Sequence, residues 1–321
     1  MFSEAVKCKM NLLTLLFITN KPELIKLQLA YLEKKLELYK YQIIVSCPFD
    51  IKDNYLSEKT IVIGENTQCP FKRLLLGVSM TKTKYIKVCS DDDLFSIDNI
   101  NHYIDFLEKN SDYVSCQGLS LACDPTREIG RPESVRPTYA SDNNSDRLCE
   151  MFCNYGHFFY SVFRTEILMN SAFALKENTE APIGINTIEL SMAMLSCIQG
   201  KCMNMSEVFL IRDPLPSQPW YWDLIIGKQA GNINSVLEYI YQRLKKGNAL
   251  SNNIQQLSDL HLWFQKYLFN DTTGMNSSQT RFIGETVFNK SMYENEYKIE
   301  KDQYVILQKI SLFKKKQVRI G

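Results

Sequence analysis

Residues 85–93 read YIKVCSDDD, and this stretch decides the fold because a short apolar strand ends directly in three consecutive carboxylates. A run of Tyr, Ile, Val and Cys is typical of a strand within a sheet. Like charges beside a buried strand repel one another and are costly to desolvate. We therefore expect a positively charged group to offset Asp91, Asp92 and Asp93.

The spacing of the three aspartates points to a binding function. In an extended chain, residues i and i+2 point to the same side, roughly 6 to 7 Å apart, so Asp91 and Asp93 are expected to face one site while Asp92 turns away. Two such carboxylates suit a hard cation such as Mg²⁺ or Mn²⁺, which keeps open positions for the phosphates of a nucleotide. The alternative is a solvated turn that also caps the following helix.

The sequence on both sides of this stretch alternates strands with helices. Residues 12–18 read LLTLLFI, as expected of a strand covered on both faces, and Thr19 or Asn20 can cap a helix whose first turn contains Pro22. The pattern predicts further strands at residues 41–46, 60–63 and 113–116, and helices at about residues 25–39, 71–78, 99–109 and 187–199. This order is typical of an α/β fold with a largely parallel sheet, in which ligands collect beyond the carboxyl ends of the strands.

Two longer segments differ from this alternation. Residues 124–146 are polar and contain three prolines, which favours a mobile lid or insertion that could cover a ligand. From about residue 225 onward the pattern is mainly helical and polar. We therefore place a domain boundary there, between a catalytic domain at 1–225 and a helical region at 226–321.

The composition excludes several classes of protein. The 321 residues are 45% apolar with a net charge of +1, which argues against a disordered chain and against binding to nucleic acid by bulk charge. Ten cysteines without a CxxC pair indicate reduced thiols. No run approaches the roughly 18 apolar residues of a spanning helix, and the N-terminal apolar run fits a strand better than a signal peptide. We expect a cytoplasmic protein.

Several catalytic motifs are absent from the sequence. It contains no GxGxxG, no GxxxxGK[ST] and no GxSxG, so a dinucleotide fingerprint, a P-loop and a nucleophile elbow are not supported. The three histidines, His102, His157 and His261, lie far apart and form no zinc-binding helix motif.

Over roughly residues 10–215 the chain resembles GT-A-fold glycosyltransferases, in particular the family 2-type group and the related bacterial surface-polysaccharide transferases. The resemblance is carried by the strand that ends in Thr19-Asn20 before Pro22-Glu23-Leu24, by Asn66, Phe71-Lys72-Arg73 and Gly77, and most strongly by residues 85–93. It implies a Rossmann-like α/β fold with a mainly parallel sheet and flanking helices, followed by the helical C-terminal region.

The resemblance also implies roles for individual residues. Thr19 and Asn20 would lie against the nucleotide, Arg73 would lie on the donor side, and residues 91–93 would handle the ribose, the diphosphate and a bound Mn²⁺ or Mg²⁺, with Asp91 and Asp93 as its ligands. The alternatives are that Thr19 only caps a helix and that Arg73 is an exposed helix cation. The implied donor is a nucleotide sugar, most simply a UDP-sugar.

In the family, an acidic pair opens a late helix and its second member is the general base, with a glycine about eleven residues later. Ile188-Glu189 before Gly200 matches this arrangement, so the resemblance assigns the base to Glu189, although the first acid is missing and the second is a glutamate. Glu180 or an acid of the segment 124–146 is an alternative base, and Glu189 is alternatively a plain N-terminal helix acid. Direct displacement would invert the anomeric centre; a retaining reaction needs no such base.

Three features beyond this core suggest further contacts. Arg212 follows an apolar run where related enzymes place a cation near the diphosphate, and a structural ion pair is the alternative. The aromatic residues 220–222 suit stacking against an acceptor sugar or packing of the C-terminal helices. The basic and apolar residues 313–320 suit peripheral contact with the inner face of the cell membrane, or a frayed terminus.

The sequence-based hypothesis is a metal-dependent glycosyltransferase that transfers a sugar from a nucleotide sugar to a carbohydrate or lipid-linked glycan acceptor during surface-polysaccharide assembly. One alternative is a nucleotidyltransferase that makes a nucleotide sugar, although no early Gly-rich phosphate loop is present. The other is a non-catalytic binding protein on the same scaffold.

Overall fold

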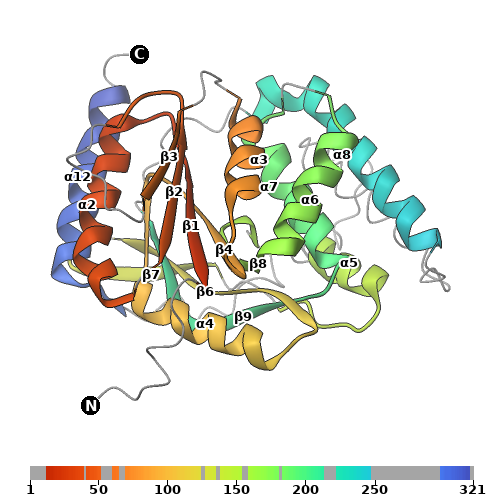
Figure 1. Ribbon diagram of the computed structural model, residues 1–321, viewed down its shortest axis with the longest axis horizontal. Helices are drawn as coiled ribbons and strands as arrows, with labels where there is room; N and C mark the ends of the chain where they lie inside the picture. Colours follow the sequence, from red (N-terminus) through yellow and green to blue (C-terminus); the bar gives the residue numbers. More distant parts are fainter. Residues whose placement is uncertain are drawn as a thin grey trace, which may run out of the picture.

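Strand β1 (Leu13–Ile18) lies at the centre of the parallel half of the sheet in the computed structural model of the chain (Figure 1). It pairs in parallel with β2 (Gln42–Cys47) on one side and β4 (Tyr85–Cys89) on the other, and β3 (Thr60–Gly64) extends the sheet beyond β2. The structure describes residues 12–39, 41–51, 60–64, 69–123, 127–134, 138–153, 158–180, 183–212, 222–246 and 297–318.

The register of these strands brings their carboxyl ends to one edge of the sheet. Phe17 of β1 lies opposite both Val45 of β2 and Cys89 of β4. The residues at the ends of these strands, Thr19, Ser46 and Ser90, therefore lie along the same edge, as expected for parallel strands. The predicted strands at this end of the chain are confirmed to within a residue or two.

The other half of the sheet is mixed. Within the described residues the strand order is β10-β7-β6-β8-β4-β1-β2-β3, and β9 adds to β6 and carries β5 on its other side. The bounds of these strands are β5 Asp93–Phe95, β6 Tyr113–Cys123, β7 Ile129–Ser134, β8 Val162–Arg164, β9 Lys201–Arg212 and β10 Tyr297–Lys298. β9 runs parallel to β6, whereas β7 and β8 are antiparallel to it. The α/β fold is confirmed.

Helices cover both faces of the sheet, as Figure 1 shows for α2 and α12 on one side and α3, α6, α7 and α8 on the other. The first face is covered by α2 (Pro22–Tyr39), α4 (Ile97–Lys109) and α12 (Lys301–Val318). The second is covered by α3 (Pro70–Met80), α5 (Asn144–Cys153), α6 (Thr165–Glu177), α7 (Ile185–Cys197) and α8 (Trp222–Lys246). β1 alternates between the two cores: Leu15 and Phe17 face the first, and Leu16 faces the second.

Gly77 sets how closely α3 lies against β1. A Cβ atom at this position would lie 2.3 Å from Cδ1 of Leu16, which is itself fully buried. The missing side chain therefore lets the helix approach the strand. This approach fixes the position of Arg73, one turn earlier on α3.

The prediction of a lid at residues 124–146 is wrong for the described part of that segment. Residues 129–134 form β7, Tyr139 makes an isolated bridge with Cys202, and α5 begins at Asn144. The reason is that β6 continues to Cys123 instead of ending near Cys116, so it offers a partner for β7.

The C-terminal elements return to the first half of the chain. β10 pairs with β7, and Gln303 of α12 donates to the hydroxyl of Tyr31 on α2 at 3.0 Å. Residues 247–296 lie outside the described residues, and the boundary near residue 225 stays a prediction. Among the described helices, none is both long and apolar enough to cross a membrane. The described cysteines are free, in agreement with the prediction of thiols.

Candidate functional site

The site lies at the edge where β1, β2 and β4 end. Thr19 follows β1, and its backbone N–H donates to the carbonyl of Ser46 at 3.1 Å, which ties the ends of β1 and β2 together. The three aspartates follow β4, and the third of them opens the short strand β5. The expectation that Thr19 and the acidic triplet meet at one edge of the sheet agrees with this geometry.

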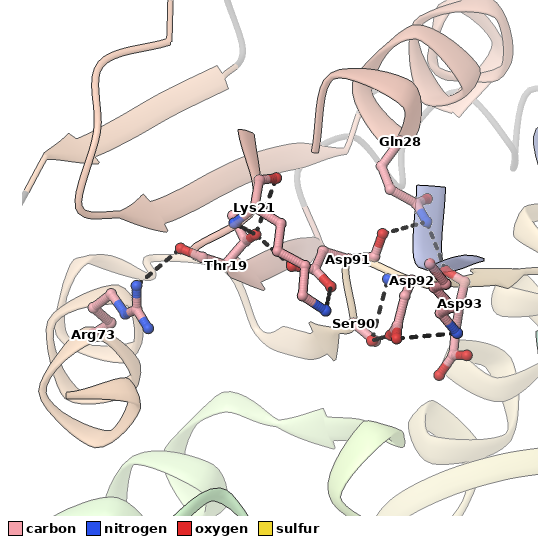
Figure 2. Close-up of polar contacts among 9 residues, drawn as sticks. Thr19, Lys21, Gln28, Arg73, Ser90, Asp91, Asp92 and Asp93 are labelled. Carbon is pink, nitrogen blue, oxygen red and sulfur yellow. Dashed lines mark hydrogen bonds and ion pairs between the residues drawn. The ribbon is translucent and has the colours of Figure 1, made fainter. Parts of the chain in front are cut away.

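Thr19 links the two sides of the site (Figure 2). Its hydroxyl donates to Oδ2 of Asp91 at 2.5 Å, and its carbonyl accepts a hydrogen bond from Nη1 of Arg73 at 2.9 Å. The N–H of Lys21 donates to the same hydroxyl oxygen at 2.9 Å. Thr19 is thus a connecting residue as well as part of the turn that leads into α2.

Each aspartate of the triplet has its own cation. Lys21 Nζ lies 3.5 Å from Asp91, Lys314 Nζ lies 3.3 Å from Asp92, and Arg212 Nε lies 3.2 Å from Asp93. The prediction that positive charge offsets the triplet is therefore confirmed. From the sequence, Arg212 was expected near the diphosphate or in a structural ion pair, whereas Lys21 and Lys314 were not expected near the triplet.

The backbone of the triplet bends instead of continuing as a strand. Nε2 of Gln28, which is fully buried on α2, donates to the carbonyl of Asp91 at 3.3 Å and to that of Asp93 at 2.8 Å. Pairing of β5 with β9 places Asp93 opposite Arg212, which sets their ion pair. Asp91 points toward Thr19 and Lys21, whereas Asp93 lies on the opposite side of Asp92 (Figure 2).

The electrostatic environment differs among the three carboxyl groups. Burial raises the pKa of Asp91, and it raises the pKa of Asp93 to about 7 even though Arg212 opposes the shift. At Asp92 burial also acts to raise the pKa, but Lys314, Lys21 and the Ser90 hydroxyl outweigh it, so the pKa is lowered. Asp92 is therefore the most firmly ionised of the three.

The expectation that Asp91 and Asp93 face one metal ion does not fit this geometry. The two carboxylates turn toward different cations, because the chain bends at residues 91 and 92. Within the described part of the chain, no group of three or more His, Cys, Asp or Glu side chains is placed to hold a metal ion. The carboxylates serve instead as partners of the surrounding cations.

Arg73 is a buried cation with few partners. Only 2% of the residue is exposed; its Nε has no hydrogen-bond partner, and no ion pair joins Arg73 to a carboxylate among the described residues. Burial lowers the pKa of its guanidinium. The alternative that Arg73 is an exposed helix cation is therefore wrong. Among the described residues the buried guanidinium makes a single hydrogen bond, and an anionic or carbonyl oxygen would supply a further partner.

Tyr160 connects Glu189 with β4, the strand that leads into the triplet. The Tyr160 hydroxyl donates to Oε1 of Glu189 at 2.7 Å, and the Tyr160 carbonyl accepts from Nζ of Lys87 on β4 at 2.7 Å. Burial, then Glu189, and also Asp93 and Asp92, raise the pKa of Tyr160 well above its usual value. Tyr160 therefore lies close enough to both Glu189 and the acidic triplet to sense their charges.

The remaining predicted residues have simpler positions. Asn20 is exposed, and Glu180 is exposed with its backbone hydrogen-bonded to the amide of Asn232. The side chains of residues 220–222 lie outside the described residues. Lys314 belongs to the segment predicted to face the membrane, but it is instead buried against Asp92.

Besides Lys314, three residues that help to build the site were missed: Lys21, Gln28 and Tyr160. A lysine two residues after the first strand and a glutamine on the buried face of the first helix were visible signals. Tyr160 carries no local signal, because its role depends on the packing of α7.

Comparison with solved structures finds similarity to S. aureus TarS. The structure of TarS residues 1–349 is 12% identical over 74% of this chain and 72% of that chain, with a TM-score of 0.44. Its complex with UDP is 11% identical over 84% and 73%, with a TM-score of 0.48. A 2-C-methyl-D-erythritol 4-phosphate cytidylyltransferase from Thermus thermophilus is 10% identical over 61% and 89%, with a TM-score of 0.35.

No protein-family model matches the chain, and no curated protein matches its sequence. Structural likeness at such low identity and TM-score carries no information about activity.

Proposed function

We propose that the chain is a glycosyltransferase that binds a nucleotide sugar between Arg73 and the acidic triplet and transfers the sugar to a carbohydrate hydroxyl. The observation that carries this proposal is the hydrogen-bonded chain from Arg73 through Thr19 to Asp91 at the carboxyl ends of parallel strands. In open α/β sheets this is where ligands bind. The buried guanidinium of Arg73 gives the site a charged hydrogen-bond donor for an anionic or carbonyl oxygen, and no described carboxylate pairs with it.

The charges of the site suit a nucleoside diphosphate. Because each aspartate is paired with a cation, Arg73 leaves a surplus of positive charge among the described residues of this edge. The paired cations Lys21 and Arg212 remain partly exposed, with 24% and 30% of their side chains accessible. A polyanionic ligand would be attracted to this combination, and a neutral sugar alone would not.

The proposed reaction is a direct displacement. The acceptor oxygen forms a bond to the anomeric carbon, the bond from that carbon to the diphosphate breaks, and its electron pair goes to the diphosphate oxygen. The acceptor proton goes to Glu189, which Tyr160 holds in place. Attack from the face opposite the leaving group inverts the anomeric centre, and a retained configuration in the product would contradict this role of Glu189.

The proposal includes no step through a metal ion, because the carboxylates expected to bind Mn²⁺ or Mg²⁺ are paired with cations. A UDP-sugar as donor, a lipid-linked acceptor and a place in surface-glycan assembly in the cytoplasm are part of the proposal. They come from the resemblance and not from a contact in the structure.

A thermal-shift panel of UDP, GDP, CDP and their sugars tests the proposal, with Arg73→Met and Lys72→Met as matched variants. Lys72 neighbours Arg73 on α3 but is exposed. A ligand at about 100 times its Kd stabilises the native state by about 2.7 kcal/mol. We expect at least one nucleotide to raise the Tm of the wild type and of Lys72→Met, but not of Arg73→Met.

Two results would contradict the proposal. If no nucleotide or nucleotide sugar changes the Tm, the chain does not bind this class of donor. If the chain instead consumes a nucleoside triphosphate and a sugar phosphate and releases pyrophosphate, it is a nucleotidyltransferase.

A further inference from the structure

The C-terminal helix α12 contributes a buried cation to the acidic triplet. Lys314 is only 6% exposed, and its Nζ lies 3.3 Å from Oδ2 of Asp92. Lysines are almost never buried unless they are paired. The position of α12 is fixed independently, since Gln303 bonds to Tyr31 and the apolar side chains of Leu307 and Ile310 are buried. Lys314 is therefore a structural component of the site.

With Lys314 in place, each of the six carboxylate oxygens of the triplet has a polar partner. The partners are Thr19 and Lys21 for Asp91, Ser90 and Lys314 for Asp92, and Arg212 Nε for both oxygens of Asp93. A divalent ion needs carboxylate oxygens that are open to it. To bind here it would have to compete with a cation or a hydroxyl that already stabilises a buried charge.

Two of the three cations that pair with the triplet are accessible to a ligand. Lys21 and Arg212 are partly exposed at the edge of the sheet, whereas Lys314 is enclosed. Preorganised cations that face developing negative charge stabilise it without a metal ion. Lys314 cannot serve in this way itself, but it neutralises Asp92, which would otherwise repel the diphosphate.

We infer that the diphosphate is received by the chain's own cations, Lys21 and Arg212, without a divalent ion, and that Lys314 is the positioning residue that makes this possible. The inference rests on the proposed function, because it concerns how that nucleotide is held. It gives α12 a role in donor binding.

Titration calorimetry of the full chain with UDP, GDP and CDP, in EDTA and in Mn²⁺, tests the inference. We expect the nucleotide that binds to do so with the same Kd, within about twofold, in both conditions. Lys314→Met should weaken binding in EDTA by about tenfold or more, because it leaves a buried carboxylate unpaired. Lys314→Arg should bind like the wild type, and so should Lys309→Met, an exposed lysine on the same helix.

Two further measurements separate a positioning role from a folding defect. In Lys314→Met, Asp92 has lost its cation, so Mn²⁺ should restore nucleotide binding, which it would not do for a misfolded chain. In the double variant Asp92→Asn/Lys314→Met both charges are absent, and binding in EDTA should return to within about threefold of the wild type.

The outcomes distinguish the two proposals. Nucleotide binding by the wild type only in Mn²⁺ would overturn the inference and leave the proposed function standing. If Lys314→Met binds the nucleotide as tightly as the wild type, the role of Lys314 is overturned. It is also overturned if nucleotide binding recovers neither in the double variant nor when Mn²⁺ is added to Lys314→Met. Failure of every nucleotide to bind in both conditions would overturn the proposed function and the inference with it.

Discussion

Tyr160 donates its phenolic hydrogen to Oε1 of Glu189 at 2.7 Å, while its own carbonyl accepts a hydrogen bond from Lys87 at 2.7 Å. Lys87 lies on β4, the strand that leads into the acidic triplet. A glutamate near the start of α7 is in this way held relative to a strand about a hundred residues earlier in the chain. A general base needs such a fixed position, because proton transfer depends on hydrogen-bond geometry.

We expect Glu189→Gln to lower kcat by about 10² to 10⁴, the range typical of general-base catalysis, with little change in nucleotide affinity. Glutamine keeps the size of the side chain and removes its basicity. Initial rates with the donor identified by the thermal-shift panel measure the effect. Glu180→Gln is the control; if it loses activity and Glu189→Gln does not, the base is Glu180.

Tyr160→Phe should lower kcat by about tenfold and leave the KM for the donor nearly unchanged. The variant loses the hydrogen bond to Glu189 but keeps the backbone bond to Lys87, so the strand is not disturbed. One neutral-to-charged hydrogen bond is worth about 1.5 to 3 kcal/mol. A change in KM alone would indicate that Tyr160 contacts the donor instead of orienting Glu189.

The ionisation of Asp93 predicts a pH dependence of stability. Because burial raises its pKa from 3.8 to about 7, the folded chain keeps a proton that the unfolded chain has released. The folded state then binds more protons between these pH values, so this group makes the chain less stable as the pH rises through the window. Asp93→Asn cannot titrate and should not show this loss.

Urea unfolding at about pH 4.5, 6 and 7.5, a series that spans the titration window, measures the effect of Asp93. The free energy of unfolding of Asp93→Asn should increase relative to the wild type across this series. Glu177→Gln, an exposed carboxylate on α6, serves as the control. A constant difference between Asp93→Asn and the wild type at every pH would show that Asp93 is ionised throughout.

Gly77→Ala tests the close approach of α3 to β1. The added Cβ would meet Leu16 at 2.3 Å, and overpacking of this kind costs about 1 to 3 kcal/mol of unfolding free energy. Because the same helix carries Arg73, nucleotide affinity should fall together with stability. Met80→Ala, at the exposed end of α3, should change neither; equal stability of Gly77→Ala and the wild type would show that Leu16 moves aside freely.

Local patterns were sufficient to predict much of this molecule. The parallel strands follow from continuous apolar runs, and α3 and α4 follow from the spacing of their buried residues. Thr19 and the triplet could be placed together because residues that follow parallel strands share one edge of a sheet. Arg73 lies on a helix, and only the resemblance placed it near them.

The rest depends on contacts between distant parts of the chain. Nothing near Lys314 indicates that it meets Asp92, and a cluster of lysines at the end of a sequence is typical of a solvated or membrane-facing segment. Likewise, the polar, proline-containing sequence of β7 predicts a loop, because it forms a strand only beside an extended β6. The metal prediction assumed an extended backbone, whereas Gln28 holds residues 91–93 in a bend.

The return of α12 to the first half of the chain also sets an order of events during synthesis. Asp92 leaves the ribosome long before Lys314, and the two meet only when α12 docks on α2. Until then the nascent sheet carries a carboxylate whose cation has not yet been made. The surroundings of Asp92 are therefore complete only after α12 has docked, and a chain that stops before α12 leaves Asp92 without its lysine, although Asp91 and Asp93 already have their cations.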